Sequence, residues 1–329
     1  MKQRLSYAST MTYREGYHYI HEIMSEMRKV IVGKDTVVLK VLMGILAGGH
    51  VLLEDMPGVG KTTLALGFAR TLGLDYRRIQ LTPDVLPSDI TGFSMYQKHT
   101  DSFVFHQGVA FCNLLLADEI NRTSSKTQSA LLELMEEGAV TVDGVTHTLP
   151  QPYCVIATQN PVGSVGTQML PESQLDRFML CLRMGYPDLE SEVNILRGNS
   201  GNSAMEEVRQ IVDAERLRTM QQLVADVYVD DAILRYIARL AAATRNHPLL
   251  RLGISPRGAL ALTAVVRAIA LARGRDYVIP DDVSVVIGDV FQHRLMLQPK
   301  ARMEHCTVAD VLKQVISSVP VPDIQGNEQ

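Results

Sequence analysis

The sequence lacks any apolar run long enough to cross a bilayer. The longest run, residues 41–53, is too short for this and is interrupted by Gly48, Gly49 and His50. No apolar segment follows the charged residues at the N-terminus, so the pattern of a secretory signal peptide is missing as well. We therefore expect a soluble, cytoplasmic protein with no segment inserted in a membrane.

Paired cysteines and an excess of basic charge are also absent. The four cysteines are scattered without a C-x-x-C pair, which is typical of idle thiols in a reducing compartment. The formal net charge is −4, whereas proteins that bind nucleic acid usually carry a basic field. We therefore expect no nucleic-acid partner, unless a local basic patch supplies the contact. The hydrophobic content of 46% is enough for a substantial core.

The first half of the chain alternates apolar strands with amphipathic helices. Helices are predicted at residues 13–27, 37–46, 61–71 and 125–135, and strands at residues 50–55, 76–82, 111–120 and 152–161. Continuous apolar strands separated by helices indicate a parallel sheet that is covered on both faces. Residues 92–108 and 138–150 have the pattern of β-hairpins, the second with Asp143-Gly144 at its turn. The sequence thus predicts an α/β core with two protruding hairpins.

Strands become rare beyond Pro187. Helical patterns follow at residues 214–227, 231–245, 256–272 and 280–294, and a loop is expected at residues 197–205. Pro280 lies in the first turn of the last of these helices, where its missing N–H costs nothing. We therefore divide the chain into an α/β domain with N-terminal helices, residues 1–187, and an all-helical domain, residues 188–329.

The segment "LLEDMPGVGKTTLA", from Leu52 to Ala65, has the pattern of a phosphate-binding loop without its first glycine. A strand, a tight loop and a helix N-terminus together form an anion site from unpaired N–H groups and the helix dipole. Lys61 suits the β- and γ-phosphates, and Thr62 suits Mg²⁺. The residues of this segment that we expect at the nucleotide are Pro57, Gly58, Val59, Gly60, Lys61, Thr62 and Thr63.

Asp55 occupies the place of the missing glycine. At about 8 Å from a phosphate charge and an effective dielectric constant of about 20, its repulsion is roughly 2 kcal/mol. Lys61 and Mg²⁺ outweigh that amount, and Asp55 lies at the exit of the strand, before the loop proper. We therefore expect the site to bind a nucleotide and the side chain of Asp55 to point away from the phosphates.

Two of the predicted strands end in polar residues. "LLLADE" ends in Asp118 and Glu119, and "ATQNP" contains Asn160. A purely structural role for the two acids is unfavourable because unpaired buried carboxylates are costly. Asp118 suits the Mg²⁺ shell. Glu119 suits polarising a water for attack on the γ-phosphate, and Asn160 suits orienting that water.

Taken in order, "GVGKT", "DE", Asn160, "LPESQLDRF" and "GISPRGAL" resemble the motifs of an AAA+ ATPase. "DEINR", "KTQSALLELMEE", "VTVDG" and "ATQNP…LPESQLDRF" narrow the resemblance to the MoxR family, and it covers nearly the whole chain. Two departures, "GVAF" for the family's GPxF and "PESQ" for its PEAQ, touch no catalytic role. The resemblance implies a P-loop NTPase core of three αβα layers, with β-hairpin insertions and a C-terminal all-α lid.

The resemblance also implies roles for further residues. Val32 and Gly33 would line the adenine pocket, and Arg177 of "LDRF" would be an arginine finger that reaches the nucleotide of a neighbouring subunit. Arg257 of "SPR" would be the second sensor, acting in cis or, if an extra helix before it swings the lid, in trans. Arg122 of "DEINR" would face the subunit interface or have a structural role.

Partners are implied only by the resemblance. AAA+ relatives usually form hexameric rings, and MoxR-like proteins remodel client proteins that commonly carry a von Willebrand factor A-type domain. A magnesium-chelatase-type motor subunit and a nucleic-acid motor of the same branch remain as alternatives, as does a nucleotide switch without hydrolysis. Of the two hairpins, only the first carries a lysine, Lys98, which disfavours nucleic acid. Glu119, Asn160 and Arg177 disfavour the switch.

Overall fold

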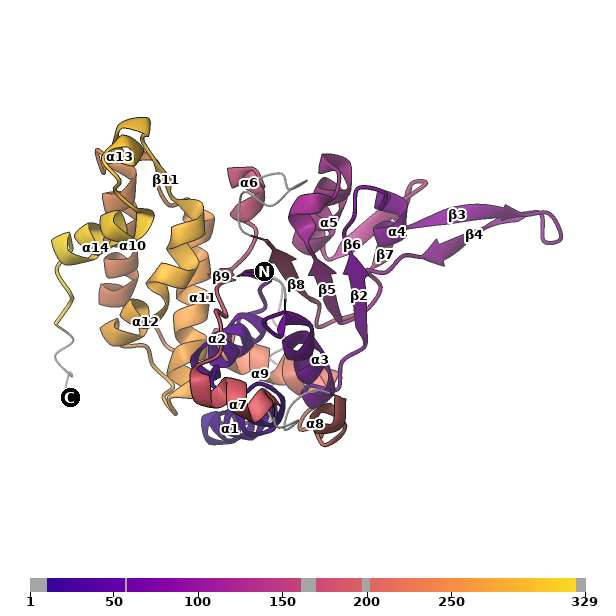
Figure 1. The fold of residues 1–329 in the computed structure, drawn as a ribbon, viewed down its shortest axis with the longest axis horizontal. Coiled ribbons are helices and arrows are strands. Elements are labelled where there is room, and N and C mark those ends of the chain that lie inside the picture. The colour runs from indigo at the N-terminus through magenta and orange to yellow at the C-terminus, as the bar shows by residue number, and fades with distance from the viewer. Residues whose placement is uncertain (1–10, 57, 161–169, 197–201, 324–329) are drawn as a thin grey trace, which may run out of the picture.

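The structure, a computed structural model, describes residues 11–56, 58–160, 170–196 and 202–323. A parallel sheet flanked by helices forms one part, and a helical lid forms the other (Figure 1). The sheet has five strands in the order β2-β5-β8-β1-β9. These strands are β1 (Val51–Glu54), β2 (Tyr76–Gln80), β5 (Leu114–Asp118), β8 (Cys154–Gln159) and β9 (Leu180–Leu182).

Apolar residues fill both faces of the sheet because successive side chains along a strand point to opposite sides. In β5, Leu114 and Leu116 join one hydrophobic cluster while Leu115 and Ala117 join the other, and all four are fully buried. β8 divides its side chains in the same way. A strand buried on both faces has no polar alternation, which explains the continuous apolar runs of the sequence.

The helices of the core divide between these two clusters. The cluster that includes Leu114 contains residues of α1 (Tyr13–Val30), α2 (Asp35–Leu46) and α3 (Lys61–Thr71). The cluster that includes Leu115 contains residues of α4 (Pro87–Thr91) and α5 (Ser125–Glu137). The predicted three-layer αβα core is therefore confirmed.

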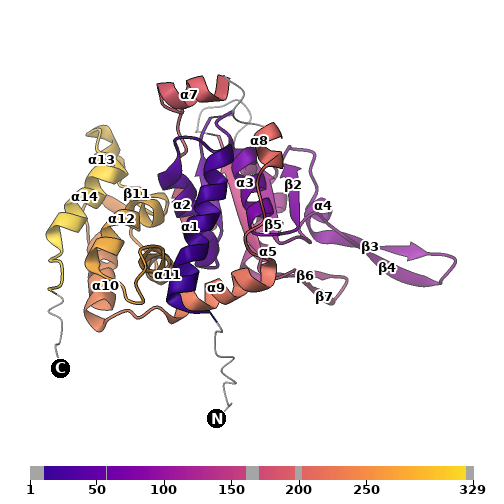
Figure 2. The ribbon, with the colours of Figure 1, turned by 90° about the horizontal axis from the view of Figure 1, so that it is seen from below.

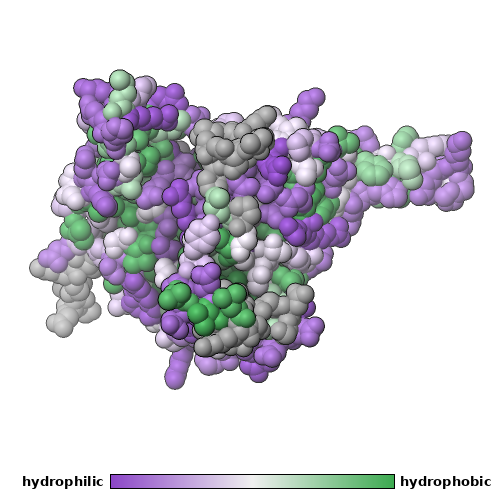
Figure 3. Space-filling model, in the orientation of Figure 1, coloured by the Kyte–Doolittle hydropathy of each residue, from purple (hydrophilic) through white to green (hydrophobic). Residues whose placement is uncertain are grey.

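Two antiparallel hairpins project from the core on the side away from the lid (Figures 1 and 2). The longer pairs β3 (Gly92–Gln97) with β4 (Ser102–Gln107), and the shorter pairs β6 (Ala139–Val142) with β7 (Val145–Thr148). Figure 3 shows apolar side chains along the longer hairpin. Its exposed large hydrophobic residues are Phe93, Met95, Tyr96 and Phe103. Both hairpins lie where the sequence predicts them.

The rest of the chain is mainly helical. The lid contributes to the same hydrophobic cluster as α1 and α2, and α11 packs against both of these helices. The remaining helices are α6 (Glu172–Leu175), α7 (Leu189–Leu196), α8 (Asn202–Glu206), α9 (Ala214–Asp226), α10 (Asp231–Arg245), α11 (Pro256–Ala272), α12 (Pro280–Phe291), α13 (Pro299–Met303) and α14 (Val308–Ser318). Two 3-10 turns, Ile120–Arg122 and Gln292–Arg294, and a short antiparallel pair, β10 (Leu250–Leu252) with β11 (Met296–Leu297), complete the described elements.

Some local predictions need correction. The strand predicted at residues 111–120 is limited to β5, because Glu119 leaves the extended conformation with a φ of 57°. Helix α8 occupies part of the loop expected at residues 197–205. β9, the edge strand beside β1, was not predicted. Among the described helices, none combines the length and apolar character needed to cross a membrane.

Candidate nucleotide-binding and catalytic site

The predicted phosphate loop lies between β1 and α3, where parallel strands present their carboxyl ends; we call this side the carboxyl edge of the sheet. Gly58 and Gly60 have φ values of 86° and 94°, a left-handed conformation that favours glycine. Gly60 caps α3 without a side chain, so no side-chain cap satisfies the first N–H groups of that helix. Such groups bind an anion well. Pro57, also expected at the nucleotide, lies outside the described residues.

Lys61 begins α3 and is largely buried. Its ammonium group donates a hydrogen bond of 2.7 Å to the main-chain oxygen of Asp55, which places it across the loop. Burial lowers the pKa of Lys61, while the charges of Asp118, Asp55 and Glu119 oppose that shift. Thr62 and Thr63 follow in the first turn of α3, next to the same loop.

The side chain of Asp55 binds a segment of the main chain instead of facing the loop. One carboxylate oxygen accepts hydrogen bonds from the N–H groups of Met184 and Gly185, the second at 3.0 Å. Lys34 donates to the carbonyl oxygens of Met184, Gly185 and Tyr186 at 2.6, 2.8 and 2.5 Å. The expectation that Asp55 turns away is therefore confirmed. The carboxylate anchors the phosphate loop to the chain that leaves β9.

Asp118 ends β5 at the carboxyl edge and is buried. It accepts a hydrogen bond of 2.5 Å from the hydroxyl group of Thr158 and pairs with Arg78 at 2.7 Å. The hydroxyl oxygen of Thr158 also accepts from the main-chain N–H of Glu119 at 2.9 Å. Thr158 and Arg78 were not predicted as site residues. The polar Thr158 inside an otherwise apolar strand is the signal that could have identified it.

Glu119 is held between two donors. Asn160 donates its side-chain amide at 3.0 Å, and Arg122 donates at 2.8 Å. Burial alone would raise the pKa of Glu119. The two hydrogen bonds and the charge of Arg122 lower it by more, so the pKa lies below its ordinary value. The carboxylate is thus kept ionised, as a group that polarises water requires. The structure brings Glu119 and Asn160 together and gives Arg122 a partner inside its own subunit.

Val32 and Gly33 lie in the turn between α1 and α2, and Ile31 just before them comes within 3.8 Å of a methyl group built on Gly60. The expected adenine pocket therefore adjoins the phosphate loop. Gly33 has a φ of 71°, and a side chain built there would meet Ser191 of α7 at 2.2 Å. Only glycine fits this close approach. Helix α7 was not predicted, so Ser191 is a neighbour of this pocket that sequence reasoning missed.

Arg177 and Arg257 do not join this group. Arg177 precedes β9, and β9 runs parallel to β1, so Arg177 lies at the opposite, amino edge of the sheet. The guanidinium groups of both arginines pair with Glu136, that of Arg177 at 3.1 Å. A cleft of about 370 Å³ lies here between core and lid, lined by these three residues and by His50 and Arg294, among others. One chain thus holds its acids at one edge and its two arginines at the other.

Comparison with known proteins agrees with this architecture. The sequence profile of the "ATPase family associated with various cellular activities (AAA)" matches residues 50–180, and that of the AAA lid domain matches residues 242–315. The uncharacterized protein YeaC of Bacillus subtilis is 46% identical over 95% of this chain and 98% of its own length. Chaperone MoxR1 of Mycobacterium tuberculosis is 40% identical over 95% of this chain and 85% of its own.

A crystal structure from Cytophaga hutchinsonii, described as that of an ATPase, superimposes with a TM-score of 0.88. It is 36% identical to this chain, and the match covers 94% of this chain and 97% of that one. The relatives therefore match in sequence, in fold and over nearly the full length. The chain belongs to the MoxR family of AAA+ ATPases, and it is an ATP hydrolase.

Proposed function

We propose that the protein hydrolyses ATP with Mg²⁺ at the interfaces of an oligomeric ring, expected to be a hexamer, and uses the energy to remodel client proteins. The single observation that carries this proposal is the separation of Glu119 from Arg177 and Arg257 across the sheet. A site whose acids and arginines lie at opposite edges would be completed by a second copy of the same chain. The domain boundary at Pro187 remains part of the proposal.

The phosphate loop would hold the nucleotide through its main-chain N–H groups and Lys61. Thr62 and Asp118 would hold Mg²⁺, which neutralises charge on the phosphates. The donor set fits a metal that keeps most of its waters, since it consists of one hydroxyl and one carboxylate. Arg78 now pairs with that carboxylate, so loading of the site would change the partners of Asp118. Val32 and Gly33 would border the adenine ring.

Glu119 would accept a proton from the attacking water, and Asn160 would hold the carboxylate and the water in place. Both side chains reach one another at 3.0 Å, so neither has to move far to share a water. The left-handed conformation of Glu119 orients its side chain in a way that an ordinary extended residue would not. This contact supports proton transfer by Glu119 and orientation of the water by Asn160.

Arg177 and Arg257 would stabilise the charge that develops on the transferred phosphoryl group of the neighbouring subunit. Both guanidinium groups meet at Glu136, at the amino edge. This shared position supports action in trans for Arg257 as well as for Arg177. Helix α9 packs against α1, α2 and α11, and it would be the extra helix before Arg257 that swings the lid.

Clients would bind the assembled ring. MoxR1 is named a chaperone, and the exposed apolar side chains of the longer hairpin offer a surface for protein contacts (Figure 3). Partners with a von Willebrand factor A-type domain remain the expectation from the family resemblance.

Mixing two inactive variants tests the ring. Arg177→Ala removes the finger and leaves its own pocket intact, whereas Glu119→Gln inactivates its pocket and leaves the finger intact. Each alone should lose ATPase activity while still binding ATP. Mixed rings contain interfaces with an intact Glu119 opposite an intact Arg177, so the mixture should recover part of the activity. The measurement is ATPase rate against mixing ratio, with subunit exchange followed by a fluorescent label.

Two results would contradict the proposal. Wild-type turnover in Arg177→Ala would remove that residue from the site. A mixture that exchanges subunits and stays inactive at every ratio would show that completion of the site across the interface is wrong or that every pocket must be competent at once. The matched control mixes Arg177→Ala subunits with Arg177→Ala/Glu119→Gln double-variant subunits. This mixture contains no intact Arg177, so it offers no complete interface in trans.

A further inference from the structure

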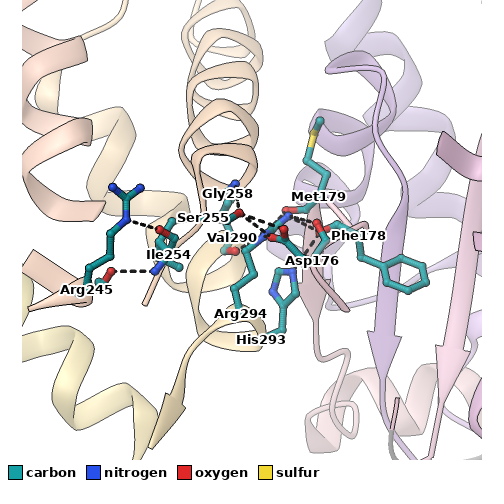
Figure 4. Close-up of polar contacts among 11 residues, drawn as sticks. Asp176, Phe178, Met179, Arg245, Ile254, Ser255, Gly258, Val290, His293 and Arg294 are labelled. Atoms are coloured by element: carbon teal, nitrogen blue, oxygen red, sulfur yellow. Dashed lines mark hydrogen bonds and ion pairs between the residues drawn. The ribbon is translucent and has the colours of Figure 1, made fainter. Parts of the chain in front are cut away.

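Arg294 is a buried arginine that holds the chain on both sides of the finger. Its residue is 4% exposed, at the end of the turn after α12. The guanidinium group makes five hydrogen bonds, as many as it has N–H donors. One goes to the carboxylate of Asp176 at 2.7 Å, and three go to the carbonyl oxygens of Asp176, Phe178 and Met179 at 3.1, 2.6 and 3.3 Å (Figure 4). The fifth goes to Val290.

Asp176 connects this arginine to the start of helix α11. The hydroxyl group of Ser255 donates to the Asp176 carboxylate at 2.9 and 3.2 Å, and the same hydroxyl oxygen caps α11 by accepting from Gly258 N–H at 3.1 Å (Figure 4). Arg257 is the second residue of α11. Arg177 directly follows Asp176. The contacts therefore join the backbone that carries the finger to the helix end that carries the second arginine.

Because Arg294 is buried, its contacts with Asp176, Phe178 and Met179 favour one relative position of these residues. Moving a guanidinium group and a carboxylate out of water is unfavourable unless they are paired and every donor is satisfied. Burial lowers the pKa of Arg294, and the Asp176 partner opposes that shift. Any displacement of the Asp176–Met179 segment relative to the lid would leave buried donors of Arg294 unpaired, so such a displacement is unfavourable.

We propose that Asp176, Ser255 and Arg294, here named the lid clamp, are positioning residues that fix Arg177 and Arg257 as one rigid pair for the neighbouring subunit's nucleotide. This inference rests on the proposed action of both arginines in trans. Four of the five hydrogen bonds of Arg294 go to residues 176–179, on either side of Arg177. Attachment of the lid alone would not require so many bonds to this one segment. Glu136 forms ion pairs with both arginines, in keeping with a fixed spacing between them.

Ser255→Ala is the mildest way to loosen the lid clamp. Thr307→Ala is its matched control, because the Thr307 hydroxyl also caps a lid helix, α14, and its described contacts, the N-cap and the capping-box bonds, are confined to the start of that helix. Both variants lose a hydroxyl cap. Ser255→Ala should lower the maximal ATPase rate roughly tenfold while ATP affinity stays within twofold, since small displacements of catalytic groups have large effects on rate. Thr307→Ala should keep a rate within twofold of the wild type.

Arg294→Lys is the stronger variant, with its fold checked by thermal unfolding. Lysine offers three donors and no planar fork, so the carbonyl contacts around the finger cannot all be kept. We expect the rate to fall about 100-fold, the size expected for a displacement of about 1 Å. In mixed rings, Glu119→Gln subunits should raise the activity of either clamp variant, because they supply an intact finger to its intact pocket. Arg177→Ala subunits should lower it.

The outcomes separate this inference from the proposed function. If Ser255→Ala and Arg294→Lys turn over like Thr307→Ala while Arg177→Ala is inactive, the lid clamp has no positioning role and the ring proposal stands. If the clamp variants lose activity but Glu119→Gln subunits fail to raise it, under conditions where they do rescue Arg177→Ala, the defect lies outside the finger and the inference is overturned. If Arg177→Ala itself is active, the proposed function fails first.

Discussion

At the carboxyl edge of the sheet the main chain adopts conformations that few residues tolerate, whereas at the amino edge charged side chains are paired around one buried arginine, Arg294. Gly58, Gly60 and Glu119 all have positive φ values at the first edge. At the second edge Arg294 satisfies all five of its donors. The first edge keeps N–H groups free for a ligand of its own subunit. In the proposed ring, the second edge would use its polar groups to hold two arginines in place for another subunit.

This difference follows from what each edge stabilises. The phosphates of a nucleotide accept hydrogen bonds from the N–H groups of a phosphate loop, so N–H groups left unpaired there favour binding. An arginine finger acts only if its geometry is fixed before the neighbour arrives, because preorganised charge costs no reorganisation during the reaction. Three experiments test whether the two edges differ in this way.

The largest expected effect is at the carboxyl edge. Glu119→Gln should lower the ATPase rate by about 10²–10⁴, the usual contribution of a positioned acid or base. ATP affinity should stay within about twofold, since the phosphate loop is untouched. Glu133→Gln, an exposed residue of α5 with the same change of side chain, is the control and should behave as wild type. Fluorescent-nucleotide binding and steady-state turnover give the two values, and undiminished turnover would show that Glu119 is not the base.

The second experiment addresses the amino edge, which contains two partly exposed histidines whose rings lie in desolvated surroundings. Burial lowers the pKa of His50 to about 4 and that of His293 to about 3, against an ordinary value of 6.5. Below pH 6.5 the unfolded chain binds protons that the folded chain does not. The free energy of unfolding is therefore unaffected by these groups above pH 6.5 and falls as the pH drops from 6.5 towards 3 to 4. At pH 5 the loss is about 2 kcal/mol for each histidine.

Urea unfolding at pH 7.5 and pH 5 measures this loss. His293→Gln should remove about half of the difference between the two pH values that comes from these histidines, and His99→Gln, on the exposed turn of the longer hairpin, should remove none. If the wild type, His293→Gln and His99→Gln show the same pH dependence of the free energy of unfolding, His293 does not limit stability in acid.

The smallest effect is expected for Asp55→Gly, which restores the missing glycine of the phosphate loop. The carboxylate faces Met184 and Gly185 and not the phosphates, so ATP affinity should change less than about tenfold. The melting temperature should fall, because two N–H groups lose a charged acceptor. Asp84→Gly, at an exposed turn position that has no positive φ, as at Asp55, is the control for the backbone effect of glycine. A gain in affinity far beyond tenfold would place the Asp55 charge at the phosphates.

The carboxyl edge was largely predictable from the sequence, whereas the amino edge was not. Asp118 and Glu119 lie at the end of an apolar strand, and Lys61 follows another after a glycine-containing loop, so local pattern and known phosphate chemistry identify them. Arg294 meets Asp176 across 118 residues of chain, and no local pattern predicts such a contact. Its own surroundings in the sequence look like an ordinary helix end.

Two other elements show the same limit. β9 is only three residues long, so the fifth strand becomes visible only when it pairs with β1. Thr158 looks like a tolerated polar residue in a strand until the fold brings it between Asp118 and Glu119. Both features depend on which strands lie side by side in the sheet, and a single sequence does not reveal that pairing.

The base of the longer hairpin has a mechanical consequence. A side chain built on Gly108 would meet the carbonyl oxygen of Ile90 at 2.2 Å, and Val109 and Ala110 donate to the carbonyl oxygens of Asp89 and Ile90. The hairpin is therefore fused to α4, and α4 packs on α5, the helix that follows Glu119. Six strand residues reach about 20 Å, so a tilt of α4 by about 10° would carry the tip roughly 3–4 Å. The hairpin is a lever whose short arm, α4, packs on the helix that follows Glu119.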